Sequence, residues 1–148
     1  MPLGPLAGLV FALALAPASP ADDPAAAERA RHQGAWAVVS LVRDGVAAPA
    51  DVVAPIRRVV EEDHVVWRRD GKNFAGTKFE VDPSKSPRAI DLIPDGGPAR
   101  DRRVLGIYRL DGDDLTICVA DPGGPRPSAF EAGPGSKQTL QTFRRVRP

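Results

Sequence analysis

The sequence predicts an all-β fold, an antiparallel up-and-down barrel of about eight strands. Short runs of strand-forming residues recur at regular spacing over most of the chain. Turn signals separate these runs, among them Asp-Gly pairs at 44–45, 70–71 and 111–112. Between them no segment has the pattern of a helix longer than about two turns. Since most connections are short enough to join neighbouring strands, an up-and-down barrel is favoured over a sandwich.

The first strand begins after Gly34 and is expected to run from Trp36 to Arg43. We expect the remaining strands to close around the Trp36 indole. The following segment contains Pro49 and Pro55, and proline is poorly tolerated at the centre of a sheet. We therefore expect a short helical turn near 50–56, which bridges to the next strand.

The rest of the chain has the pattern of a β-meander. The expected strands are 57–60, 64–69, 73–81, 88–93, 104–110, 115–120 and 138–145. Within the meander the two longest connections are 94–103 and 121–137, and both are rich in glycine and in charged residues or proline.

The N-terminal residues are expected to be a targeting segment rather than part of the fold. The apolar run 6–16 has the length of a signal-peptide core and is too short for a bilayer span, which needs about 20 residues. Small residues at 16–18 and at 19–21 offer two cleavage sites, although the terminal amine is the only positive charge before the run. We predict a signal peptide at 1–21, a linker or frayed helix at 22–33 and a barrel domain at 34–146. The alternative is an apolar N-terminus that stays attached, either buried or as a tail.

The composition gives no indication of a nucleic-acid or lipid-surface protein. The chain has 20 Lys and Arg against 19 Asp and Glu, a formal net charge of +1. The single cysteine, Cys118, lies in a strand pattern, where it is expected to be a small buried hydrophobe rather than a reactive thiol. After cleavage, the mature chain is expected to be exported, to the periplasm, cell envelope or medium, without stable membrane insertion.

No motif in the sequence nominates a catalytic or metal site. Nucleophile-elbow, phosphate-loop and dinucleotide fingerprints do not occur. The acidic cluster 61–64 has the pattern of a hairpin turn, and 111–114 lacks the spacing of a calcium loop. The sequence thus predicts a non-catalytic protein without cofactor or metal.

Several segments, in this order and spacing, resemble a secreted lipocalin-like domain family of unknown function that is expanded in planctomycete bacteria. They are 33–40, 89–92, 105–113, 115–118, 126–130 and 134–136. The resemblance covers about Arg31 to Arg145, and the chain departs from the family pattern at Lys137 and in the middle loops.

The resemblance implies a lipocalin-type barrel and carries over no established catalytic residue. It also implies that Gly34 and Trp36 form the closed floor of the barrel, with Arg144 or Arg145 from the last strand packed over the indole.

The open end of such a barrel is the natural place for one small ligand. We hypothesise that Phe130 holds the loop 121–137 across this end and that Arg126 presents its cation to an anionic or polar ligand. The simpler interpretation is that Phe130 covers the edge of the core and that Arg126 pairs with an acid. Tyr108 either faces outward, which is the preferred interpretation, or lines the cavity. The alternative function is a secreted or cell-surface interaction module with a solid core.

Overall fold

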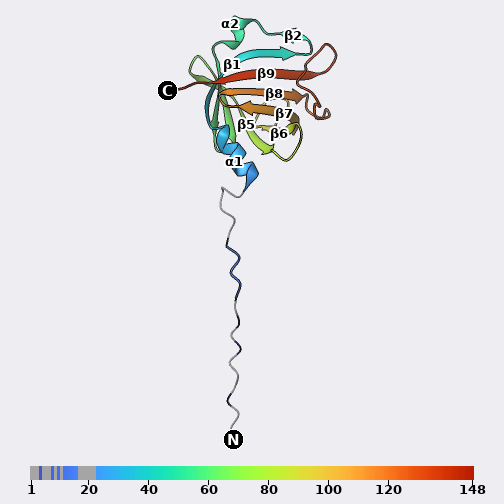
Figure 1. Ribbon diagram of the computed structural model, residues 1–148. Helices are drawn as coiled ribbons and strands as arrows, with labels where there is room; N and C mark the ends of the chain where they lie inside the picture. The colour runs from blue at the N-terminus through green and yellow to red at the C-terminus, as the bar shows by residue number, and fades with distance from the viewer. Residues whose placement is uncertain (1–3, 5–7, 9, 11, 17–22) are drawn as a thin grey trace.

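The protein is a closed antiparallel β-barrel of eight strands with one short additional strand, which confirms the predicted fold class (Figure 1). The computed structural model describes residues 4, 8, 10, 12–16 and 23–148. The strands follow the order β2-β1-β3-β4-β5-β6-β7-β8-β9, and a further pairing between β1 and β9 closes the barrel. Apart from β2 at the edge of β1 and the closing pair β1–β9, neighbouring strands in the barrel are also consecutive in sequence.

The elements of the structure match the predicted runs closely. They are α1 (Pro24–Arg31), β1 (Gly34–Arg43), β2 (Val46–Ala47), α2 (Ala50–Val53), β3 (Ile56–Glu61), β4 (His64–Arg69), β5 (Lys72–Asp82), β6 (Arg88–Pro94), β7 (Val104–Asp111), β8 (Asp114–Ala120) and β9 (Gln138–Arg145). The predicted helical turn is α2. Strand β2 was not predicted; it pairs with the end of β1 across the turn at Asp44 and Gly45.

Strand β1 closes the barrel because it pairs on both of its edges. Residues 34–37 pair with β3, and residues 36–43 pair with β9. The β9 ladder shifts register between Val38 and Ser40. Such a bulge bends a strand and increases its twist, which helps the sheet to close.

The segment expected to be a linker or frayed helix contains the capped helix α1. The Asp23 carboxylate accepts the Ala25 amide at 3.0 Å, and Pro24 occupies the first turn, where its missing N–H costs nothing. Glu28 and His32 are buried, and the helix packs against β5.

Of the predicted signal segment, positions 17–21 and most of 1–11 lie outside the described residues. No helix in the described part of the chain is long and apolar enough to cross a membrane.

The apolar core fills the barrel interior. Its buried members are Trp36, Val38, Val53, Val60, Val65, Phe79, Val81, Ile90, Tyr108, Leu110, Leu115, Ile117 and Phe143. Ile107 and Cys118 are also buried, but they form a cross-strand pair on the opposite face of β7 and β8. The Cys118 thiol donates to the Glu131 carbonyl at 3.3 Å, so the loop 121–137 covers this outer face as a second layer. Cys118 is a free, buried thiol, and burial raises its pKa.

Candidate functional site

Trp36 lies at the end of the barrel next to α1 and is fully buried. Its indole N–H donates to the His32 carbonyl at 2.9 Å, which joins the first strand to the end of the helix. The guanidinium carbon of Arg145 lies 4.2 Å from the centre of the indole ring. A flat ring and a cation stacked on its face thus fill this end of the barrel.

Arg145 also binds the backbone that leads from α1 into β1. Its guanidinium donates to the carbonyls of Gln33 at 2.7 Å and Arg31 at 2.8 Å. Gly34 follows with a φ of +102°, in a region that disfavours side chains, and this turns the chain from the helix into the strand. Arg144 points to solvent and pairs with Asp114 at 3.2 Å. The resemblance implied that either Arg144 or Arg145 packs over the Trp36 indole, and Arg145 is the one that does.

Arg145→Met is expected to lower the free energy of unfolding by about 2–3 kcal/mol. It removes a cation–π contact, two charge-assisted hydrogen bonds and a part-buried ion pair with Asp113 at 3.3 Å. Arg144→Met is the matched control, because an exposed ion pair contributes at most about 1 kcal/mol. Urea denaturation of both variants checks the difference. Equal losses for the two would contradict the assignment of Arg145.

The interior also holds a charged side chain, Arg58 of β3. The residue is 1% exposed, and its two terminal guanidinium nitrogens have no hydrogen-bond partner among the described residues. Its guanidinium carbon lies 5.6 Å from the centre of the Phe143 ring and 5.8 Å from that of Phe79. Ring faces attract a cation, but they replace only a small part of the hydration it has lost.

His32 is the second polar group without a partner inside the barrel. It is fully buried, and neither ring nitrogen forms a hydrogen bond within the described residues. Burial, followed by the nearby charges of Arg58, Arg31 and Arg145, lowers the pKa of His32 to about 3. The imidazole is therefore neutral at physiological pH, packed against the rings of Phe79 and Tyr108.

Tyr108 faces the interior, so the preferred outward interpretation was wrong. Its ring lies edge-on to His32 at 5.0 Å and belongs to the buried core. Burial, together with the Glu28 carboxylate, raises the pKa of the phenol. Both faces of β7 are apolar, because Ile107 is buried under the loop 121–137 while Tyr108 and Leu110 face inward.

A cavity of about 280 Å³ opens at the end of the barrel away from α1. Its lining comes from β1, β3, β4, β5 and β9. The lining residues are Val38, Leu41, Ile56, Trp67, Phe74, Ala75 and Gln141. All of them except Gln141 are apolar. We call this space the mouth cavity. The Phe74 side chain, 57% exposed, borders it beside the bulge of β5 against β4.

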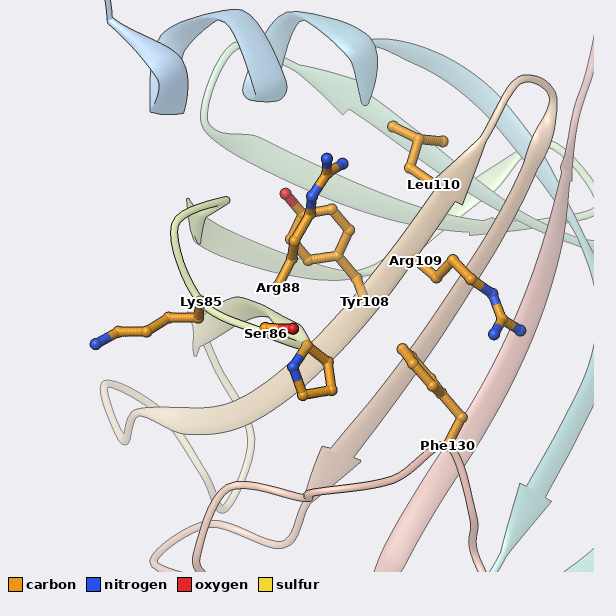
Figure 2. Close-up of a pocket in the computed structure, with 8 residues that line it drawn as sticks. Lys85, Ser86, Arg88, Tyr108, Arg109, Leu110 and Phe130 are labelled. Carbon is orange, nitrogen blue, oxygen red and sulfur yellow. The ribbon is translucent and has the colours of Figure 1, made fainter.

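A second pocket, of about 290 Å³, opens beside β7 near the turn between β5 and β6, and it brings Tyr108 and Phe130 together (Figure 2). Its remaining lining residues are Lys85, Ser86, Pro87, Arg88, Arg109 and Leu110. Figure 2 shows the Tyr108 hydroxyl near Arg88, with Arg109 and Phe130 facing each other on the other side. The Arg109 guanidinium is stacked on the Phe130 ring at 4.9 Å, and Arg88 pairs with Glu28 at 3.2 Å. Both arginines thus already have partners within the protein, so this pocket has fewer free groups for binding a ligand than its size suggests. We therefore consider the mouth cavity the better candidate.

The hypothesis that Phe130 holds the loop 121–137 across the open end of the barrel was wrong. The loop lies against the outer wall, where Phe130 packs on Arg109 of β7. At its far end the Gly45 amide donates to the Ala132 carbonyl at 2.6 Å, and the Pro134 ring lies so close to Gly45 that no side chain fits there.

Arg126 is also placed outside the barrel. It pairs with Asp91 at 2.8 Å and donates to the Gly106 carbonyl at 2.7 Å. These contacts agree with the simpler interpretation, in which Arg126 pairs with an acid. The guanidinium fastens the loop to β6 and β7 and is not directed at the mouth cavity.

The residues that line the mouth cavity were not singled out from the sequence. The alternation of side chains along the strands could have indicated them, because alternate residues share one face. Arg58 shares its face of the strand with Ile56 and Val60, and Trp67 shares its face with Val65. Among the described residues no group of three or more His, Cys, Asp or Glu side chains is placed to hold a metal ion. No family model, no curated protein and no solved structure matches the chain.

Proposed function

We propose that the protein is an exported, non-catalytic lipocalin-like domain that binds one small ligand with a hydrocarbon body in the mouth cavity. The observation that carries the proposal is an open, apolar-lined space at one end of a barrel whose other end is filled. Pockets for small molecules are concave and mostly apolar, with volumes from about 300 Å³ upward and few polar groups. The mouth cavity, at about 280 Å³ with Gln141 as its one amide, lies just below this range, which limits the ligand to a small molecule.

The chemistry of the rim supports a ligand with a hydrocarbon body. Phe74 and Trp67 present aromatic surface to the cavity, and Phe74 is largely exposed. Covering apolar surface contributes about 25 cal/mol per Å². A ligand that contacts both rings would recover this free energy, whereas a strongly polar ligand would find only Gln141 to replace its water contacts.

The export part of the proposal is supported by the apolar run 6–16 and the small residues that follow it. The alternative function, a secreted interaction module, is favoured by exposed valines on the outside of the barrel, Val39 at 59% and Val46 at 72%. We prefer ligand binding because Phe74, an aromatic side chain that is also exposed, borders the mouth cavity and not the outer wall of the barrel.

Filling the mouth cavity tests the proposal. The neutral fluorophore N-phenyl-1-naphthylamine is expected to bind the wild-type protein with enhanced emission, and Ala75→Trp to weaken that binding at least tenfold, which corresponds to about 1.4 kcal/mol. Val39→Trp is the matched control, because it places the same ring on the outer face of the barrel, and we expect it to bind the probe as the wild type does. An unchanged affinity in Ala75→Trp, or no binding to the wild type, would contradict the proposed function.

A further inference from the structure

The interior beneath the mouth cavity contains a cation that the described part of the chain does not neutralise. Arg58 lies within the barrel, 1% exposed, with both terminal guanidinium nitrogens unbonded. The buried carboxylate of the described residues, Glu28, is already engaged: it pairs with Arg31 and Arg88, each at 3.2 Å. No salt bridge to Arg58 occurs within the described residues.

A buried, unpaired guanidinium would be stabilised by a bound anion. Removing a guanidinium from water without a paired charge is costly, and buried charges in proteins are normally paired and hydrogen-bonded. Arg58 could extend to water from a strand edge, yet it occupies an inward position of β3, opposite Trp36 on one side and Trp67 on the other. A guanidinium has five donors arranged in a fork that matches a carboxylate.

Arg58 does not line the mouth cavity itself, but it neighbours residues that do. Trp67 lines the cavity and is the cross-strand partner of Arg58. Phe143 contacts both side chains, since its ring centre lies 6.0 Å from that of Trp67 and 5.6 Å from the Arg58 guanidinium carbon. Ile56, two residues before Arg58 on the same face of β3, lines the cavity as well. Movement of the Trp67 or Phe143 ring would connect the cavity with Arg58.

We infer that the ligand of the mouth cavity is a carboxylic acid with a short hydrocarbon chain, whose carboxylate pairs with Arg58 while its chain lies against Trp67 and Phe74. This inference rests on the proposed function and specifies its ligand class. The apolar lining excludes a second charged group on the chain, because only Gln141 could serve it. Binding displaces the ring of Trp67 or Phe143, so it also changes the fluorescence of Trp67.

The experiment compares octanoate with 1-octanol, two ligands with the same chain and different head groups. Calorimetry and competition with N-phenyl-1-naphthylamine measure their affinities for the wild-type chain and for Arg58→Met. We expect the wild type to bind octanoate at least tenfold more tightly than octanol, because only the carboxylate forms charge-assisted hydrogen bonds with Arg58. We expect Arg58→Met to bind octanoate and octanol about equally, with the octanol affinity of the wild type retained.

Two further measurements keep the outcomes distinct. Without ligand, Arg58→Met is expected to melt at a higher temperature than the wild type, since an apolar side chain replaces an unpaired buried charge. If Arg58→Met does not fold, Arg58→Lys takes its place and should keep part of the preference for octanoate. Equal wild-type affinities for octanoate and octanol would overturn the role of Arg58 and leave the mouth cavity as an apolar site. Failure of octanol and of the fluorophore to bind would overturn the proposed function itself.

Discussion

Replacing Trp36 with alanine is expected to lower the free energy of unfolding by about 3–5 kcal/mol, the loss typical of a fully buried large aromatic residue. The indole is completely enclosed, and three contacts depend on it: the core around it, the hydrogen bond to the His32 carbonyl and the stacked Arg145 guanidinium. Its removal leaves a cavity at the floor and a buried carbonyl without a donor. Helix α1 would lose the hydrogen bond that joins its C-terminal end to β1.

Urea denaturation followed by circular dichroism measures this loss. Trp36→Phe keeps most of the ring and is expected to lose less, which provides a value if the alanine variant does not fold. Trp67→Ala is the matched control at the other end of the barrel, where the indole is only partly buried and lines an open cavity. We expect less than half the loss there. A loss below about 1 kcal/mol in Trp36→Ala would contradict the role of the indole as the floor of the barrel.

The fold could be predicted because each strand carries its own local signal. Period-two alternation marks most strands, and the Asp-Gly pairs at 44–45, 70–71 and 111–112 mark three of the hairpin turns. The glycines of these pairs have positive φ values, which is the backbone conformation that such turns require. Closure of the barrel followed from the short connections.

The faces of β7 could not be predicted by the same reasoning. Alternation distinguishes inside from outside only where one face meets water. The loop 121–137 covers the outer face, so Ile107 and Cys118 are buried there while Tyr108 is buried within. Where both faces are buried, periodicity carries no information about direction. The hypothesis that Phe130 closes the mouth cavity was wrong for a related reason: a loop with an aromatic anchor can pack on a barrel wall as well as on its rim.

The candidate site was missed because its chemistry depends on a charge in an unusual place. Arg57 and Arg58 are adjacent in sequence, and composition alone would expose both. The parity shared by Ile56, Arg58 and Val60 was the available signal. Helix α1 was similarly underestimated, since Asp23 and Pro24 are suitable for a helix start while the contacts that hold the helix come from the distant β5.

Acidification from about pH 7 to pH 5 is expected to destabilise the wild-type protein by about 2 kcal/mol through His32 alone. An unfolded histidine has a pKa of about 6.5, whereas burial lowers the pKa of His32 to about 3 in the folded state. Between these values the unfolded chain binds the proton and the folded chain does not. Stability is therefore fully retained above the unfolded pKa and falls by up to about 1.4 kcal/mol per pH unit below it.

His32→Phe separates this effect from the titration of the carboxylates. A phenyl ring can keep the contacts with Phe79 and Tyr108 but cannot bind a proton. We expect urea midpoints measured at pH 7, 6 and 5 to fall in the wild type and to change little in the variant. His64→Gln is the control for the other histidine, which is partly exposed and pairs with Asp95 at 2.8 Å; it leaves His32 in place and is still expected to lose stability on acidification. If His32→Phe and the wild type lost stability equally on acidification, His32 would not be buried as a neutral base at the floor of the barrel.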